Sequence, residues 1–361
     1  MAKEARQLDT ELLLDWYDRS RRILPWREDP TPYHVWVSEI MLQQTRVDAV
    51  IPYYLRFMEA LPDAAALASA EEETYLKLWE GLGYYSRVRN MHKAAVQIME
   101  DYSGQLPSSV EELQTLAGIG RYTAEAIASI AFGIPVPSVD GNLLRVFARR
   151  TCYPEKIKSG EALKAAESFY AERIPSRRPG DYNQAVMDLG ATICLPNGVP
   201  LCDQCPWNGL CASHKERTEL SYPVIPPKKK RTVSLYSVLL FRTEDRVILE
   251  HRPGEGLLSG LIGFPMLEGH LSEKKLRSLM AGQNIPAGSV TILSEYKHIF
   301  SHREWLNRIV EIRLPEADLD SVLSSDLFRD TALFSAAVTE LQDRYSIPAA
   351  FRPCADHFRS D

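Results

Sequence analysis

The sequence predicts a mainly α-helical domain followed by a smaller α+β domain. Apolar residues recur at helical spacing over residues 8–132 and again over 143–193. After residue 231, short apolar runs bounded by turn residues indicate strands. A chain of 361 residues is long enough to bury a sizeable core in each of two domains.

The helical part begins with an apolar stripe that ends at Leu24-Pro25-Trp26. Proline interrupts a helix, so a break is expected there. Gly81-Leu82-Gly83 and Gly118-Ile119-Gly120 interrupt the pattern further along the chain. We expect helices over residues 33–44, 47–58, 64–70, 73–81, 87–102, 110–116, 122–132, 143–150, 160–174 and 182–193.

Residues 217–231 are predicted to form a linker, because they contain three prolines and the run Lys228-Lys229-Lys230-Arg231. The favoured interpretation of this run is a solvated tether, and transient contact with DNA phosphate is the alternative. Beyond the linker we expect strands over 234–241, 246–250, 290–296 and 306–314, the first two of them paired, and helices over 273–280 and 335–345.

Composition is that of an ordinary soluble globular protein, with 45% hydrophobic and 25% charged residues. No apolar run reaches membrane length and the first residues do not resemble a signal peptide, so we expect a cytoplasmic location. The net charge of −6 argues mildly against a nucleic-acid partner. A sum over the whole chain can still hide a basic face.

The turn Gly118-Ile119-Gly120 is a candidate anion site. Backbone N–H groups left bare at Gly120, where the next helix begins, would bind an anion such as a nucleic-acid phosphate. By itself this turn is a weak signal, because a plain helix-turn-helix corner is the more common explanation.

Four of the six cysteines lie close together, with the spacing Cys-x7-Cys-x2-Cys-x5-Cys. A disulfide framework is disfavoured in a cytosolic protein, which leaves a metal site. Four thiolates at such spacing suit one iron–sulfur cluster. Zinc is the less favoured alternative, since its sites more often use two distant Cys-x2-Cys knuckles. The residues concerned are Cys194, Cys202, Cys205 and Cys211.

Glu39 is a candidate general acid. Its neighbours three and four residues away on the expected helix are Val35, Trp36, Leu42 and Gln43. On such an apolar face the carboxylate is disfavoured and its pKa rises, which is what a general acid needs near neutral pH. A solvated helix glutamate is an equally weighted alternative.

Asp140 precedes Gly141-Asn142 and an apolar run, so a helix N-cap is its favoured interpretation. A capping carboxylate stays ionised, because the helix N–H groups stabilise its charge. A protonated Glu39 with an ionised Asp140 would suit cleavage of a glycosidic bond, whose transition state resembles an oxocarbenium ion.

Together these features resemble a known superfamily. Gly118-Ile119-Gly120, the following Asp140 and the four cysteines resemble the helix-hairpin-helix, the catalytic aspartate and the 4Fe–4S loop of the endonuclease III superfamily of DNA glycosylases. Within it, the adenine DNA glycosylase family is closely similar over nearly the whole chain. The motifs that carry this resemblance are Leu24-Pro25-Trp26-Arg27, Trp36-Val37-Ser38-Glu39, Met41-Leu42-Gln43-Gln44-Thr45, Gly81-Leu82-Gly83-Tyr84-Tyr85-Ser86-Arg87, Val139-Asp140-Gly141-Asn142 and Asn183-Gln184-Ala185.

The resemblance implies a monofunctional enzyme of base excision repair. It would flip adenine out of a mispair with 8-oxoguanine or guanine and hydrolyse the N-glycosidic bond. Glu39 is implied to protonate the adenine and Asp140 to stabilise the sugar cation, with Tyr122 and Asn142 in their polar network. Tyr122 stands where bifunctional relatives carry a catalytic lysine. Since tyrosine cannot form a Schiff base, lyase chemistry should be weak or absent.

Other residues are implied to bind the base or the DNA. The implied adenine pocket consists of Trp26, Arg27, Leu42, Val47 and Gln184. The implied DNA and lesion contacts are Gln44, Thr45, Leu82, Tyr84, Gly118, Gly120, Phe300, Ser301 and His302. Among these, Gln44 would wedge into the base stack, and the ring of Tyr84 would stack beside 8-oxoguanine.

The resemblance also implies the domain plan. It gives a catalytic region over 1–216, a linker over 217–231 and a Nudix-like 8-oxoguanine recognition domain over 232–361. Within the catalytic region, a six-helix barrel module would span about 26–133, and a cluster module would combine 1–25 with 134–216. A Nudix hydrolase needs a helix with several glutamates for magnesium, whereas residues 271–280 contain only Glu273, so hydrolase activity is not expected there.

The implied cofactor is a 4Fe–4S cluster on Cys194, Cys202, Cys205 and Cys211, and the implied partner is mispaired double-stranded DNA. We expect a monomer in a bacterial-type cytosol, associated with the nucleoid. Two features depart from the family: a first cysteine gap of seven residues where six is usual, and Leu261-Ile262-Gly263-Phe264-Pro265 where Trp-Glu-Phe-Pro is frequent. The alternatives are a bifunctional glycosylase and lyase, or a non-catalytic DNA-binding module with a zinc knuckle.

Overall fold

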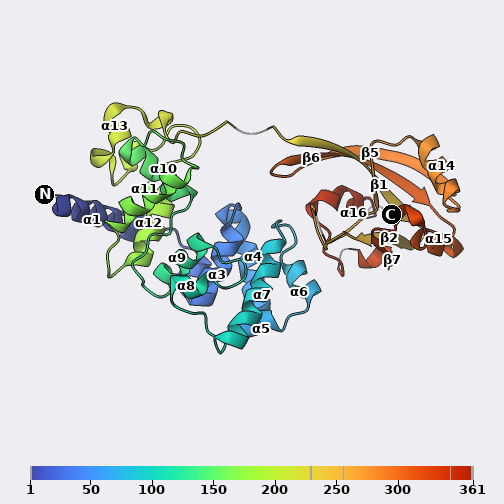
Figure 1. Ribbon diagram of the computed structural model, residues 1–361, viewed down its shortest axis with the longest axis horizontal. Helices are drawn as coiled ribbons and strands as arrows, with labels where there is room; N and C mark the ends of the chain where they lie inside the picture. Colours follow the sequence, from blue (N-terminus) through green and yellow to red (C-terminus); the bar gives the residue numbers. More distant parts are fainter. Residues whose placement is uncertain (1, 228–229, 255, 342, 359–361) are drawn as a thin grey trace. The chain divides into compact units, whose positions relative to one another are not determined.

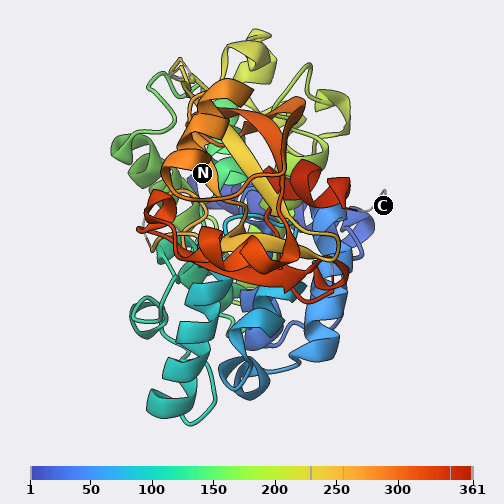
Figure 2. The same ribbon diagram turned by 90° about the vertical axis from the view of Figure 1, so that its right-hand side faces the viewer.

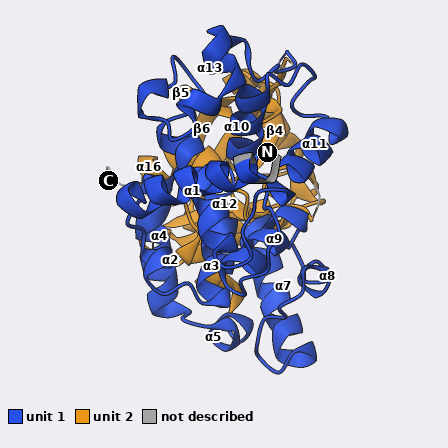
Figure 3. Cartoon of the chain, turned by 90° about the vertical axis from the view of Figure 1, so that its left-hand side faces the viewer, with its two compact units in different colours: residues 1–70, 86–227 blue, residues 71–85, 228–361 orange. Residues whose placement is uncertain are grey.

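The chain forms two compact units, which are described separately (Figure 3). The computed structural model describes residues 2–227, 230–254, 256–341 and 343–358. The first unit comprises residues 1–70 and 86–227, and the second comprises 71–85 and 228–361. Lys228 and Lys229 of the predicted tether lie outside the described residues. No helix within the described ranges is both long enough and apolar enough to span a bilayer.

The first unit consists mainly of helices (Figure 1), as predicted. Each helix expected in its sequence is present, with ends that differ by a few residues. They are α1 (Ala2–Ser20), α3 (Pro32–Leu42), α4 (Val47–Ala60), α5 (Ala64–Ala68), α7 (Ser86–Asp101), α8 (Val110–Leu113), α9 (Arg121–Ile130), α10 (Gly141–Thr151), α11 (Gly160–Ala171) and α12 (Pro179–Thr192). Two further short helices were not predicted: α2 (Pro25–Glu28), which begins at the expected break, and α13 (Ala212–Glu216).

One apolar core joins the first helix to three helices that follow the hairpin. The stripe of α1 buries Leu13 and Tyr17 against α10, α11 and α12. On α10 the apolar residues recur three and four apart, which places them on one face. This core therefore sets the N-terminus of α10 beside α12, where the site described below is built. The α10–α12 part of the core consists of Leu143, Val146, Phe147, Ala166, Tyr170, Tyr182, Ala185, Val186 and Leu189.

Helix α3 is buried on nearly all sides, since every residue from Tyr33 to Met41 except His34 has little exposed surface. A helix that is apolar all round belongs in a core. Carbonyls at the C-terminus of α3 and at its C-cap Gln43 accept hydrogen bonds from Arg87 on α7. The Arg87 Nη1 atom donates to the carbonyls of Ile40 at 2.7 Å, Met41 at 3.2 Å and Gln43 at 2.8 Å.

The second unit is built on a mixed sheet, whose strands face the viewer in yellow to red in Figure 2. Within its described residues the sheet has seven strands, with the path β3-β2-β1-β6-β5, while β4 pairs with β1 and β7 pairs with β2. Strands β1 and β6 run parallel along their whole length. The strands are β1 (Thr232–Arg242), β2 (Arg246–His251), β3 (Ile262–Gly263), β4 (Met266–Glu268), β5 (Ser289–Ile299), β6 (Arg303–Arg313) and β7 (Ala332–Ala337).

Helices cover both faces of this sheet. Leu276 and Met280 of α14 (Glu273–Gly282) and Val322 of α15 (Leu319–Leu323) pack on one face. Cys354 of α16 (Arg352–His357) and Phe351, the residue directly before this helix, pack on the other face. The unit also includes α6 (Glu72–Leu78) from the segment 71–85. The predicted α+β class is confirmed, and the predicted pairing of the first two strands is present at Arg242 and Val247.

The helix predicted over 335–345 is wrong. Residues Ala332–Ala337 form β7, which pairs antiparallel with β2, and a single 3-10 turn follows over Val338–Glu340. Ala336 and Ala337 favour a helix locally, yet each lies opposite a residue of β2. Pairing with a long-range partner decides strand formation more strongly than local preference does.

We predict that Arg87→Met lowers the free energy of unfolding by about 2 kcal/mol, because it removes charge-assisted hydrogen bonds to the end of α3. Urea unfolding followed by tryptophan fluorescence would measure this change. Lys93→Met, an exposed change on the same helix, is the matched control and should stay within about 0.5 kcal/mol of the unchanged protein. Equal losses in the two variants would contradict the bracing role of Arg87.

Candidate active site

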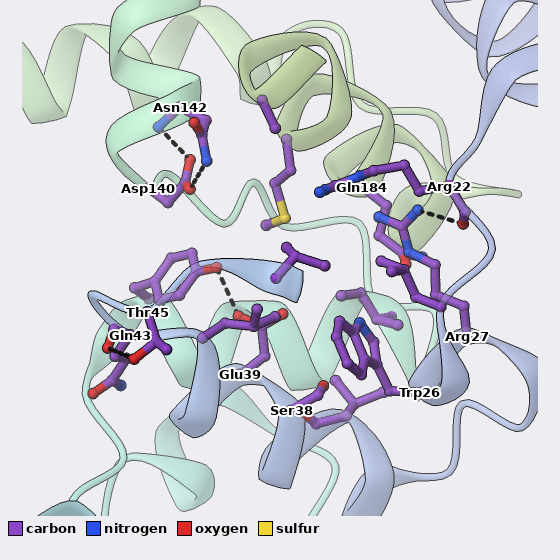
Figure 4. A pocket seen from close by; sticks show the side chains of 18 of the residues that line it. Arg22, Trp26, Arg27, Ser38, Glu39, Gln43, Thr45, Asp140, Asn142 and Gln184 are labelled. Carbon is purple, nitrogen blue, oxygen red and sulfur yellow. Dashed lines mark hydrogen bonds between the residues drawn. The ribbon is translucent and has the colours of Figure 1, made fainter. Parts of the chain in front are cut away.

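A cavity of about 460 Å³ in the first unit brings the predicted site residues together (Figure 4). Helices α2, α3 and α9 form one side of it, and the N-terminus of α10 with one face of α12 forms the other. Every residue predicted for catalysis or for the adenine pocket lines it, and so do Gln44 and Thr45. The predicted residues in its wall are Trp26, Arg27, Glu39, Leu42, Gln44, Thr45, Val47, Tyr122, Asp140, Asn142 and Gln184.

Glu39 lies in the wall formed by α3, where only 8% of its surface is exposed. The Tyr122 hydroxyl of α9 donates a hydrogen bond of 2.7 Å to Glu39 Oε2. Burial raises the pKa of the Glu39 carboxyl to about 7; the nearby Asp140 charge adds to this, and Tyr122 and Arg27 oppose it. Near neutral pH, Glu39 can therefore hold a proton and give it up.

Asp140 faces Glu39 from across the cavity (Figure 4). It is the predicted N-cap of α10: its Oδ1 accepts from the backbone N–H groups of Asn142 and Leu143, both at 2.8 Å. Its Oδ2 accepts from the side-chain amide of Asn142 (Nδ2) at 2.7 Å. Burial nevertheless raises the Asp140 pKa above its ordinary value, against the effect of these hydrogen bonds. The Asp140 pKa is therefore raised, whereas the cap hydrogen bonds alone would lower it.

Arg145 and Gly190 hold Asn142 in place, and neither was predicted. Arg145 Nη2 donates to Asn142 Oδ1 at 2.8 Å, and Arg145 Nε donates to the Cys194 carbonyl at 2.8 Å. Gly190 on α12 lies so close that an added Cβ would sit 2.6 Å from the Asn142 Cβ. Sequence spacing could have indicated Arg145, since it follows Asn142 by three residues on one helix face. No local pattern indicates Gly190.

Arg22, Arg27 and Asp188 form an ion-pair cluster at the Arg27 side of the cavity. The sequence did not predict Arg22 or Asp188 as site residues. Asp188, with a side chain 1% exposed, accepts from Arg27 at 2.8 and 3.0 Å. It also accepts from Arg22 Nε at 2.7 Å. These arginines hold the Asp188 pKa below its ordinary value despite burial. The Arg27 guanidinium is thereby kept in the cavity wall beside Gln184.

The predicted DNA and lesion contacts divide between the two units. In the first, Gly118 has a φ of +76°, and an added Cβ there would lie 2.6 Å from the Asn90 Cβ. Gly120 caps α9, with nothing within 4 Å of an added Cβ, so its backbone is open as predicted. Gln44 also has a left-handed backbone, with φ of 58°.

In the second unit, Tyr84 is 49% exposed, whereas Leu82 is only 8% exposed. The Tyr84 hydroxyl forms a short hydrogen bond with the Ser301 hydroxyl. Ser301 and His302 are exposed in the β5–β6 turn, while the Phe300 ring packs inward at 4.7 Å from the Trp305 ring. The structure thus brings Tyr84 and Ser301 together and packs the partly buried Phe300 against the core of its own unit.

The four predicted metal-ligating cysteines line one cavity of the first unit, together with Arg149, His214 and Glu219. Cys194 lies there despite the long first gap. Burial and the neighbouring cysteine sulfurs raise the pKa of Cys205 to about 12, so a positive metal centre would be needed to hold it as a thiolate. Cys202, His214 and Glu219 also offer ligand atoms within 4.8 Å of one another.

The stretch that carries Glu39, Tyr122 and Asp140 matches a class of DNA base-excision proteins. Residues 37–172 match the HhH-GPD superfamily of base excision DNA repair proteins, and residues 237–357 match the NUDIX domain. A thermostable thymine-DNA glycosylase superposes with a TM-score of 0.54 at 25% identity, over 60% of this chain and 99% of that one. A structure of an endonuclease III–DNA covalent intermediate has the same fold, with a TM-score of 0.51 at 22% identity, over 60% of this chain and 99% of that one.

Curated relatives narrow the class to one family. The adenine DNA glycosylase of Buchnera aphidicola subsp. Baizongia pistaciae is 34% identical over 81% of this chain and 82% of its own length. The mouse adenine DNA glycosylase is 36% identical over 84% of this chain and 70% of its own length. For the human protein, 35% identical over 80% of this chain, the match spans only 64% of its length. The chain belongs to the adenine DNA glycosylase family.

We predict that Glu39→Gln stabilises the protein at neutral and higher pH. The Glu39 pKa is raised from 4.5 to about 7, so the folded protein loses stability as pH rises through this range, where only the unfolded chain ionises freely. At about pH 8 the variant should exceed the unchanged protein by roughly 3 kcal/mol in free energy of unfolding, and near pH 4 the difference should vanish.

Urea unfolding at the two pH values measures this difference. Glu59→Gln, which removes an exposed carboxylate on α4, is the matched control and should show no such pH dependence. A difference of the same size at both pH values would show that the Glu39 carboxyl does not titrate in the predicted range.

Proposed function

We propose that this chain is a monofunctional adenine DNA glycosylase that removes adenine mispaired with 8-oxoguanine or guanine. The observation that carries the proposal is the pair of carboxyl groups across one cavity, with Glu39 poised near neutrality under the Tyr122 hydroxyl. A glycosidic bond needs both a proton for the leaving base and a negative charge for the developing sugar cation. Membership of the adenine DNA glycosylase family supports the choice of base.

In the proposed reaction, Glu39 donates its proton to a ring nitrogen of the flipped adenine. The bond between the deoxyribose carbon and the base nitrogen then breaks, and its electron pair leaves with the base. The Asp140 carboxylate stabilises the positive charge on the sugar, and a water molecule adds to that carbon and releases a proton. Asn142, braced by Arg145, would hold the Asp140 carboxylate towards the sugar.

Base removal without strand cleavage follows from Tyr122. A lyase step needs an amine that forms a Schiff base with the sugar, and the residue beside Glu39 is a phenol. Burial and the nearby carboxyl groups raise the Tyr122 pKa well above its ordinary value. A hydroxyl that keeps its proton is suited to donating a hydrogen bond to Glu39, and it is unsuited to nucleophilic attack.

We assign adenine recognition to the rest of the cavity wall. The Trp26 ring offers a flat apolar surface for the base, and the Gln184 amide can pair with its hydrogen-bonding edge, as amides do with adenine. Leu42 and Val47 would close the sides. Arg27 would stay fixed by Asp188 and contribute a positive charge near the base.

On the DNA, the exposed backbone at Gly118 and Gly120 would bind phosphate. Gln44 would enter the base stack, with Thr45 beside it. In the second unit Tyr84, Leu82 and the turn Phe300-Ser301-His302 would contact 8-oxoguanine. The contact between Tyr84 and Ser301 supports a shared role, whereas the inward packing of Phe300 favours an anchoring part for that ring.

We propose that Cys194, Cys202, Cys205 and Cys211 hold a 4Fe–4S cluster that supports the DNA-binding surface and takes no part in bond cleavage. Four cysteine sulfurs around one cavity fit this cofactor. Zinc is the second candidate, because Cys202, His214 and Glu219 offer mixed donor atoms close together. We also propose that the protein acts as a monomer on double-stranded DNA in the cytosol, at the nucleoid.

We predict that the protein releases adenine from an adenine:8-oxoguanine duplex in a single-turnover assay, and that strand breakage needs alkali or heat. Asp140→Asn should slow release by at least about 100-fold, because the charge opposite the sugar cation is lost. Asp101→Asn, an exposed change at the end of α7, is the matched control and should leave the rate unaltered.

Undiminished release by Asp140→Asn would refute the proposed mechanism. A covalent enzyme–DNA adduct trapped in high yield by borohydride would instead support the bifunctional alternative. Binding of duplex DNA with no release of base would support the non-catalytic alternative.

We predict that protein purified without oxygen contains about four iron and four sulfide per chain. Cys205→Ser should lower the iron content, whereas Cys152→Ser, a change outside the cavity, should leave it unaltered. Elemental analysis and visible absorption measure both. Stoichiometric zinc in a colourless protein would overturn the cluster assignment.

A further inference from the structure

The segment 71–85 interrupts the first unit in sequence but belongs to the second unit in space. It carries α6 and the turn Gly81-Leu82-Gly83, which is followed by Tyr84. Gly81 has a φ of +102°, Gly83 of +71° and Tyr84 of +50°. Such a run of left-handed backbone is costly for a tyrosine and persists only where surrounding contacts hold it.

Within the segment, Trp79 braces the turn. Its side chain has no exposed surface, and its indole Nε1 donates to the Gly83 carbonyl at 3.1 Å. The Leu82 N–H donates to the Trp79 carbonyl at 3.1 Å. These two hydrogen bonds within the segment brace the turn that exposes Tyr84.

Tyr345, Ser346 and Arg352 contact α6 and the residue Glu80 that follows it. Lys77 Nζ donates to the Tyr345 carbonyl at 3.3 Å. Arg352 lies 3.6 Å from Glu80, at the surface. The third contact, made by Ser346, is buried.

Ser346 contacts the segment on both sides of the turn. Its hydroxyl donates to the Leu76 carbonyl at 3.2 Å and lies 3.4 Å from the Tyr85 hydroxyl. All three residues are at most 9% exposed. One side chain therefore ties the helix before the turn to the tyrosine after it. The next residue, Ile347, is part of the core of the second unit.

A second attachment lies at the β5–β6 turn, where Ser301 contacts Tyr84. This turn is fixed in its own sheet, because the Phe300 N–H donates to the Arg303 carbonyl at 2.8 Å and the Phe300 ring packs on Trp305. The loop is thus attached to the sheet domain at two places, at Tyr84 through Ser301 and at Leu76 and Tyr85 through Ser346.

We propose that Ser346 is a positioning residue for lesion recognition: it clamps the 76–85 loop so that Tyr84 meets Ser301 in one preformed lesion-contacting surface. Residues 71–85 and the sheet domain then act as one recognition element, although the catalytic cavity lies wholly in the first unit. The clamp itself rests on the contacts above, and its consequence for lesion choice rests on the proposed function.

The test compares Ser346→Ala with Ser346→Thr, which keeps the hydroxyl, in the full-length protein. Ser335→Ala is the matched control, since Ser335 also uses its hydroxyl in a side-chain hydrogen bond, to Arg246 elsewhere in the domain. Amide hydrogen exchange over residues 76–85 should become at least about five-fold faster in Ser346→Ala. It should stay unaltered in the control and be restored in Ser346→Thr.

Single-turnover excision from adenine:8-oxoguanine and adenine:guanine duplexes supplies the second measurement. The ratio of the two rate constants should fall about five-fold in Ser346→Ala, the factor expected from one neutral hydrogen bond. The adenine:guanine rate should change by less than about two-fold, which a general loss of folding would not allow.

Unchanged exchange over 76–85 in Ser346→Ala would overturn the clamp. Faster exchange with an unchanged ratio would overturn its role in lesion choice. If the unchanged protein excised no adenine, the proposed function would fail, while the exchange measurement would still decide whether Ser346 holds the loop.

Discussion

Burial of one carboxyl group, that of Glu39, is the constraint on which the first unit depends. Helix α3 is apolar nearly all round, so it packs in a core, and it takes Glu39 with it. In that environment the charged form is disfavoured and the pKa rises to about 7, while the Tyr122 hydroxyl satisfies one carboxyl oxygen. The packing that stabilises α3 is therefore also the cause of an acid that works near neutral pH. Stability and chemistry have one physical origin here.

Asp140, in the opposite wall of the cavity, is stabilised differently from Glu39. Asp140 has its charge stabilised by the N-terminus of α10, and its position depends on close packing between α10 and α12 at Gly190. Arg145 extends this arrangement to the carbonyl of Cys194, the first of the four cysteines. Two hydrogen bonds of Arg145 thus connect the cysteine segment to Asn142 in the cavity wall.

Much of this could be predicted from sequence. Helical periodicity identified most helices of the first unit, the cap pattern identified Asp140 as an N-cap, and the cysteine spacing indicated a metal site. Predictions failed where a distant partner outweighed local preference. The first residues of the stretch expected as a helix over 335–345 belong to β7, which pairs with β2. The Asp140 pKa rises because the side chain is buried, and the cap motif does not reveal this burial.

The sequence by itself determined what is local: the cap at Asp140, the turn at Gly118 and the cysteine spacing. Only the tertiary structure decided which groups meet. Tyr122 and Glu39 are 83 residues apart, Arg27 and Asp188 are 161 apart, and Ser346 and Leu76 are 270 apart. Hydrogen bonds and burial act over a few ångströms, so partners so distant in the chain leave no periodic signal. Their pairing arises when the cores of the two units form.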